Sequence, residues 1–171
     1  MGRNEVLIVD DEPDLCELLA LALNRIGVAS QSVGTIAEAK VAMAGGEFGL
    51  CLTDLRLPDG SGMELLSWIV DQHPTVPCAV ITAHGNVESA VRALKIGAFD
   101  FLSKPLDLGD LRNLVARALK LALAEVEERP ERGERMLTGQ SEAMRELRQL
   151  IRRVARSQAP VHIQGESGVG K

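Results

Sequence analysis

The sequence is poor in aromatic residues, in cysteine and in basic charge. Its 171 residues include no tyrosine, one tryptophan and three phenylalanines, so a module that stacks bases or sugars on aromatic rings is not expected. Lysine and arginine number 19 against 24 aspartates and glutamates, which argues against a basic nucleic-acid-binding protein. The longest apolar run, residues 18–23, is far shorter than the ~18 residues that a membrane span needs. Cys16, Cys51 and Cys78 stand in apolar runs without metal-binding spacing, which predicts buried free thiols in a cytoplasmic protein with no membrane partner.

Short apolar runs alternate with helical patterns over most of the chain. Strand-like runs occupy residues 6–9, 28–33, 50–53, 78–81 and 99–103. Helical spacing follows each of them, over residues 13–26, 36–44, 63–71, 86–96 and from 107 to beyond 123. Buried strands joined by helices predict an α/β fold, a doubly wound five-stranded parallel sheet covered on both faces.

Local signals predict where several of these helices begin and end. Thr35, Asn86 and Asp107 are candidate N-caps, because their side-chain oxygens can accept a hydrogen bond from the first helical turn. Gly27 and Gly97 follow helical patterns and predict helix ends.

The composition changes near residue 125. Residues 1–124 hold 10 Lys/Arg and 16 Asp/Glu, whereas residues 125–171 hold 9 and 8. Residues 124–135 are charged and contain Pro130 and Gly133, which predicts a linker or a fraying helix end. A further amphipathic helix is predicted over residues 142–156, and its arginines are interpreted as a solvated face rather than a DNA contact.

Four predicted strands end in residues that carry chemistry. Asp10 and Asp11 end the first strand, Asp54 the third, Thr82 the fourth and Lys104 the fifth. Ligands of such sheets bind beyond the carboxyl ends of the strands, so these groups are expected in one crevice. Two carboxylates ~4 Å apart repel by ~4 kcal/mol at an effective dielectric of 20. The cluster therefore needs a cation, and all-oxygen ligands suit Mg²⁺.

This crevice predicts phosphoryl chemistry. An exposed carboxylate at Asp54 can attack phosphorus, while the metal and Lys104 stabilise charge on the phosphoryl oxygens and Thr82 hydrogen-bonds one of them. Taken singly, each residue has an ordinary structural alternative. Residues 10–13 would be a helix start, Asp54 a turn acid, Thr82 a helix cap and Lys104 a solvated strand end. These alternatives do not explain why all of them fall at carboxyl ends of parallel strands.

Four segments carry a family resemblance. Residues 6–12 (VLIVDDE), 52–60 (LTDLRLPDG), 81–84 (ITAH) and 104–105 (KP) resemble the receiver domain of bacterial response regulators. The resemblance covers residues 5 to about 122, so residues 1–123 are identified as a receiver domain with a flavodoxin-like (CheY-like) fold. It implies that Asp54 is the phosphoacceptor. It also implies that Asp10, Asp11 and Asp54, with the main-chain carbonyl of Arg56, hold Mg²⁺.

The same resemblance implies a switch. Thr82 and Lys104 would contact the phosphoryl group, and the Lys104–Pro105 peptide bond would be cis. Phe101 occupies the position of the family's switch aromatic, and Thr82 with Phe101 would report phosphorylation. A plain core aromatic is the alternative for Phe101.

A second motif closes the chain. Residues 165–171 (GESGVGK) follow a predicted strand and fit the phosphate loop G-x-x-x-x-G-K. Together with residues 137–144 (LTGQSEAM), they resemble the opening of the AAA+ domain in sigma-54-dependent activators of the NtrC family, so residues 136–171 are taken as a fragment of it. The candidate ATP contacts are Gly165, Glu166, Ser167, Gly168, Val169, Gly170 and Lys171. Because the Ser/Thr and helix that complete the loop are absent, ATP is expected only in the full-length protein. The alternative interpretation of residues 165–171 is a glycine-rich turn that binds no phosphate.

These resemblances imply a two-component response regulator. A sensor histidine kinase would phosphorylate Asp54 and thereby control a fused activator that acts on sigma-54 RNA polymerase and promoter DNA through parts outside this chain. The chain itself is not expected to be an enzyme.

An apolar stripe near the end of the last predicted helix is expected to pair with a second copy of the chain as a homodimer. The stripe comprises Leu119, Ala122, Leu123 and Val126.

Three other function classes conflict with features of the sequence. A phosphatase with an aspartyl nucleophile needs a general acid nearby, but Arg56 stands two residues after Asp54. A flavodoxin-like cofactor binder needs a hydroxyl- and glycine-rich turn after the first strand, and that turn is acidic. A working ATPase is excluded for this chain by its incomplete phosphate loop.

Overall fold

The structure is a computed structural model that describes residues 4–82 and 87–127. Its elements in chain order are β1 (Glu5–Val9), α1 (Pro13–Asn24), β2 (Ala29–Val33), α2 (Ile36–Gly45), β3 (Leu50–Asp54), β4 (Arg56–Leu57), β5 (Gly60–Ser61), α3 (Gly62–Gln72), β6 (Cys78–Thr82), α4 (Val87–Ile96), β7 (Asp100–Ser103) and α5 (Leu108–Glu127).

Five strands form one parallel sheet in the order β2-β1-β3-β6-β7. This confirms the predicted doubly wound α/β fold. The short strands β4 and β5 form a separate antiparallel hairpin directly after β3, in a segment for which the sequence patterns predicted no strand. The hairpin lies beside the carboxyl end of the central strand and therefore beside the site.

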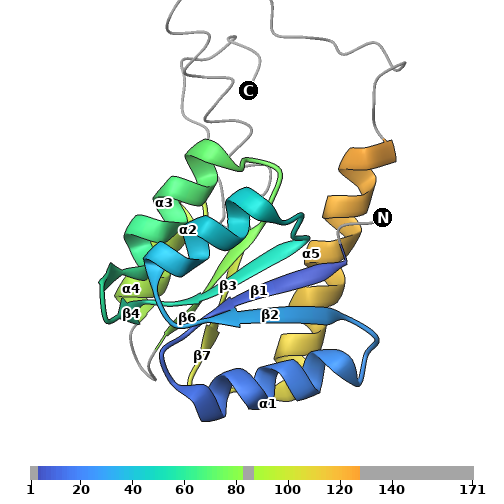
Figure 1. Cartoon of the computed structure of the whole chain (residues 1–171), viewed down its shortest axis with the longest axis horizontal. Coiled ribbons are helices and arrows are strands. Elements are labelled where there is room, and N and C mark those ends of the chain that lie inside the picture. The colour runs from blue at the N-terminus through green and yellow to red at the C-terminus, as the bar shows by residue number, and fades with distance from the viewer. Residues whose placement is uncertain (1–3, 83–86, 128–171) are drawn as a thin grey trace, which may run out of the picture.

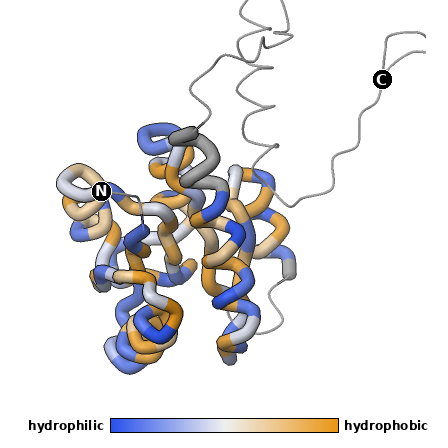
Figure 2. The backbone as a smooth tube through the Cα atoms, turned by 90° about the vertical axis from the view of Figure 1, so that its right-hand side faces the viewer, coloured by the Kyte–Doolittle hydropathy of each residue, from blue (hydrophilic) through white to orange (hydrophobic). Residues whose placement is uncertain are grey.

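Helices cover both faces of the sheet, α1 and α5 on one side and α2, α3 and α4 on the other (Figure 1). The alternation of side chains along each strand explains the two layers: Leu50 and Leu52 pack with α1 and α5, whereas Cys51 between them packs with α2 and α3. Along the helices, hydrophobic and hydrophilic residues alternate in bands (Figure 2), as amphipathic helices require. The cysteines are free and buried, as predicted.

Most predicted helix boundaries are confirmed. Thr35 Oγ1 accepts a 3.1 Å hydrogen bond from the Glu38 amide at the start of α2. The Asp107 carboxylate accepts hydrogen bonds from two amides in the first turn of α5. Gly27 follows α1 with φ +76°, a left-handed conformation that favours glycine. The cap predicted at residue 86 lies outside the described residues.

The predicted dimer stripe needs one correction. Leu119 is only 7% exposed, because it packs into the core between the sheet, α1 and α5 of its own domain. It is therefore not available to a second copy. The side chains of Ala122, Leu123 and Val126 lie outside the described part, although their backbone continues α5 to Glu127.

Predictions about residues 128–171, including the phosphate loop, lie outside the described residues. Within the described residues, no helix combines the length and apolar character needed to cross a membrane.

Candidate functional site

The carboxyl ends of β1, β3, β6 and β7 meet at one edge of the sheet. There Asp10, Asp54 and Thr82 are 2%, 9% and 3% exposed, and Lys104 follows β7 with its side chain 24% exposed. A pocket of about 830 Å³ opens over this edge, and Asp54, Thr82 and Lys104 are among the residues that line it. The four predicted positions are thus brought together.

Lys104 is the central cation of the site. Its Nζ lies 2.5 Å from Asp54 Oδ2, 2.6 Å from Glu12 Oε1 and 3.2 Å from Asp10 Oδ2. Burial by itself lowers the pKa of Lys104, but the hydrogen bonds to Asp54 and Glu12 and the charges of Asp54 and Asp10 outweigh it, so the pKa is raised overall. The ammonium therefore stays charged and is shared by three carboxylates.

Hydrogen bonds position both the backbone and the side chain of Asp54. Its Oδ1 accepts a 2.7 Å hydrogen bond from the Arg56 amide, and its carbonyl oxygen accepts one from Thr53 Oγ1 at 2.9 Å. Gly62 packs against the same carbonyl so closely that a Cβ at Gly62 would lie 1.9 Å from the oxygen. The carboxylate is thus fixed at the pocket floor.

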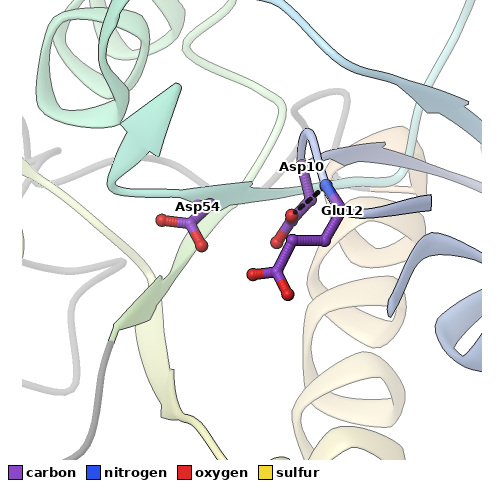
Figure 3. A group of neighbouring side chains, drawn as sticks. All are labelled: Asp10, Glu12 and Asp54. Atoms are coloured by element: carbon purple, nitrogen blue, oxygen red, sulfur yellow. Dashed lines mark hydrogen bonds between the residues drawn. The ribbon is translucent and has the colours of Figure 1, made fainter. Parts of the chain in front are cut away.

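Asp10 has one satisfied and one unsatisfied oxygen. Oδ1 accepts a 2.9 Å hydrogen bond from the Glu12 amide, whereas the buried Oδ2 makes no hydrogen bond. Burial raises the pKa of Asp10, against the lowering effects of that hydrogen bond and of Lys104. Carboxylate oxygens of Asp10, Glu12 and Asp54 all lie within 4.8 Å of one another (Figure 3). A buried oxygen that makes no hydrogen bond and lies beside two further carboxylates fits a hard divalent cation.

The acidic group differs in one member from the sequence-based set. Asp11 is exposed and lines the pocket, but it is not part of the close group with Asp10 and Asp54. Glu12 takes that place, although the sequence analysis treated it only as part of a helix start. The position of Glu12, two residues after Asp10, could have predicted this, because that spacing lets both side chains reach the same strand end.

Phe101 lies apart from this pocket. It is 40% exposed and lines a second pocket of about 610 Å³ together with Pro105 and residues of α5. The Lys104–Pro105 bond is cis, as the resemblance implied. The roles of Phe101, and of the Arg56 carbonyl as a metal ligand, stay predictions.

The β4–β5 hairpin is tied to α2 by Asp59, which the sequence analysis did not single out. Its two carboxylate oxygens accept hydrogen bonds from the amides of Ile36 (2.8 Å) and Ala37 (2.9 Å). The hydrogen bond from Ile36 lowers the pKa of Asp59 most, burial raises it, and the hydrogen bond from Ala37 lowers it further, so the pKa is lowered overall. The loop after Asp54 is thereby joined to a helix distant in sequence.

Comparisons with known proteins agree with this geometry. Residues 6–116 match the model of the response regulator receiver domain, and residues 137–171 match that of the sigma-54 interaction domain. The chain is 53% identical over its whole length to the response regulator protein PilR of Pseudomonas aeruginosa and 34% identical to the DNA-binding transcriptional regulator NtrC of Escherichia coli. It spans 38% and 37% of those proteins.

A solved structure shares the fold. The receiver domain of NtrX from Brucella abortus is 35% identical and superposes with a TM-score of 0.65 over 67% of this chain and 98% of that one. The receiver model covers well over half of the chain, and the parallel sheet carries its acidic site where that fold predicts it. The chain therefore belongs to the response regulator receiver family and carries, after its receiver, part of a sigma-54 interaction domain.

Proposed function

We propose that Asp54 accepts a phosphoryl group from a phosphohistidine of a sensor histidine kinase. One observation carries the proposal: the Asp54 carboxylate lies at the floor of an open pocket, 2.5 Å from a lysine and within 4.8 Å of two further carboxylates. A carboxylate in this setting is an oriented nucleophile beside fixed positive charge.

In the transfer, a carboxylate oxygen of Asp54 attacks phosphorus and forms an O–P bond. The P–N bond to the kinase imidazole breaks, and its electron pair stays on the imidazole nitrogen. Lys104 holds positive charge against the phosphoryl oxygens, and Thr82, on the neighbouring strand end, is close enough to the pocket to hydrogen-bond one of them. The backbone contacts to Asp54 keep the nucleophile in place throughout.

Asp10, Glu12 and Asp54 supply the oxygen atoms that would hold Mg²⁺, with Asp11 and the carbonyl of Arg56 as further candidates. The buried Asp10 Oδ2, which makes no hydrogen bond, favours such a cation at this position. When bound, Mg²⁺ neutralises the carboxylates and the charge of the incoming phosphoryl group.

The phosphorylated receiver would control the activator to which it is fused. This part of the proposal rests on the match of residues 137–171 to a sigma-54 interaction domain. In the full-length protein, residues 165–171 would bind ATP, and further parts would engage sigma-54 RNA polymerase and promoter DNA. The protein would work in the cytoplasm as a homodimer, with the receiver acting as a switch rather than as an enzyme.

Intact-mass spectrometry after incubation with acetyl phosphate and Mg²⁺ tests the proposal. The chain is expected to gain one phosphoryl mass, and EDTA is expected to abolish the gain. Asp54→Asn should remain unlabelled, whereas Asp14→Asn, which removes an exposed carboxylate on α1, should label like the wild type. Equal labelling of wild type and Asp54→Asn, or labelling that ignores EDTA, would contradict the mechanism.

A further inference from the structure

Arg92 is a cation at the rim of the phosphoacceptor pocket that the proposed mechanism does not use. It lies on α4, one turn after Ser89, and both residues line the pocket with Asp54 and Lys104. The neighbouring positions Ala90 and Ala93 are buried against the sheet, so the helix is oriented with Arg92 at the opening. Among the described residues, the exposed Arg92 side chain makes no ion pair or hydrogen bond.

Phosphorylation changes the charge balance of the pocket. Lys104 is already shared by Asp54, Glu12 and Asp10. Converting Asp54 into an acyl phosphate adds roughly one negative charge and three strong acceptor oxygens. A single shared ammonium leaves part of this new charge uncompensated, even with a divalent cation in the acidic group.

A guanidinium suits the remaining phosphoryl oxygens. Arginine presents paired N–H donors that match phosphate geometry, and it stays charged at all accessible pH values. The other arginine of the pocket, Arg56, belongs to the β4–β5 hairpin immediately after Asp54, whereas Arg92 comes from a separate helix. Of these two arginines, only Arg92 would join the phosphoryl group to α4.

The packing of α4 allows a contact at Arg92 to influence the position of the helix. Its fully buried side chains among the described residues are Ala90 and Ala93, with Leu94 and Ile96 partly buried against the core. By contrast, α5 fully buries larger side chains, including Leu111, Leu114 and Val115. Small side chains bury little apolar area, so α4 is held to the sheet more weakly than α5. A charge-assisted contact at Arg92 is therefore large relative to the forces that position this helix.

We propose that Arg92 binds the phosphoryl oxygens of phosphorylated Asp54 and so ties α4 to the phosphorylation state. The inference rests on the proposed function, because it requires an acyl phosphate at Asp54. Arg92 acts as a positioning residue for the phosphoryl group, and Mg²⁺ binding to the acidic group does not involve it.

Isothermal titration calorimetry on the 171-residue chain tests this with two probes, Mg²⁺ alone and beryllium fluoride in the presence of Mg²⁺ as a phosphoryl mimic. Arg92→Gln should weaken beryllium fluoride binding by about 10-fold or more, the worth of a charge-assisted hydrogen bond. It should leave Mg²⁺ affinity within about twofold of the wild type. Arg92→Lys should fall in between, because a point charge replaces the paired donors.

Lys95→Gln is the matched control, since it removes one exposed positive charge from the same helix away from the pocket. It should bind beryllium fluoride like the wild type. Equal beryllium fluoride affinity in Arg92→Gln and Lys95→Gln, or a parallel loss of Mg²⁺ affinity in Arg92→Gln alone, would overturn the inference. Failure of the wild type to label at Asp54 with acetyl phosphate would instead overturn the proposed function, which makes the two failures distinguishable.

Discussion

At the residue scale, Asp10 Oδ2 is the single buried side-chain oxygen or nitrogen without a hydrogen bond in the described part of the chain. Burial raises the pKa of Asp10 above its value in the unfolded chain. The ionised Asp10 carboxylate therefore lowers the free energy of unfolding. Below the pKa of the unfolded chain, Asp10 is protonated in both states and this cost is absent. As pH rises through the pKa of the folded protein, the carboxylate ionises and the stability is lost. A bound cation would offset this loss.

Asp10→Asn is accordingly expected to be more stable than the wild type at pH 7 in EDTA. The amide can still accept the hydrogen bond from Glu12 without a buried charge, and the gain should be about 1–3 kcal/mol. The difference should shrink below about pH 3, where the wild-type carboxyl is protonated as well. Thermal unfolding followed by circular dichroism, with and without Mg²⁺, measures it. A variant that is less stable at pH 7 in EDTA, or that gains as much from Mg²⁺ as the wild type, would contradict this account.

Gly62 is the second residue whose role follows from a single contact. A Cβ there would lie 1.9 Å from the carbonyl oxygen of Asp54, so Gly62→Ala must displace the backbone that carries the nucleophile. The expected loss of stability is about 1–3 kcal/mol, and labelling by acetyl phosphate should slow. Gly45→Ala is the control, because a Cβ at that position meets no atom within 4 Å. If both variants label at the wild-type rate, the close approach does not position Asp54.

At the element scale, the contact between the β4–β5 hairpin and α2 rests on Asp59. Asp59→Ala leaves the amides of Ile36 and Ala37 without this acceptor, and the melting temperature should fall by roughly 2–6 °C at neutral pH. Because these hydrogen bonds lower the pKa of Asp59, the stabilisation is present above the unfolded pKa and is lost as pH falls through the folded pKa.

The difference between wild type and Asp59→Ala should therefore narrow in acid, as thermal melts at pH 7 and about pH 2.5 would show. Glu47→Ala, which removes an exposed carboxylate from the loop before β3, serves as the control and should match the wild type at both pH values. A difference that is independent of pH would mean that the charge of Asp59 is not what holds the hairpin to the helix.

At the scale of the whole molecule, self-association is expected through the end of α5, after the buried Leu119. Leu119 is buried within the domain, so the contact would involve Leu123 and its apolar neighbours. Leu123→Glu should weaken association by about 10-fold or more, the worth of one buried leucine. Lys120→Glu, an exposed position on the same helix, should change it far less. Sedimentation velocity at high concentration, with and without beryllium fluoride, measures both; monomers alone in the wild type would exclude this dimer.

The sheet and the outline of the site follow from the order of residues along the chain. Buried apolar runs separated by amphipathic helices specify parallel strands, and the carboxyl ends of parallel strands must meet at one edge. For that reason Asp10, Asp54, Thr82 and Lys104 could be assigned to one crevice before their distances were known.

Which side chains touch depends on how the folded elements pack. Glu12 reaches Lys104 across 92 residues of sequence, and Asp59 reaches Ile36 across 23. Leu119 continues an apolar stripe in the sequence, but the packing of α5 against α1 and the sheet buries it. Periodicity reports the face on which a residue lies, whereas contacts between distant elements depend on helix position and side-chain direction, which arise when the whole domain packs.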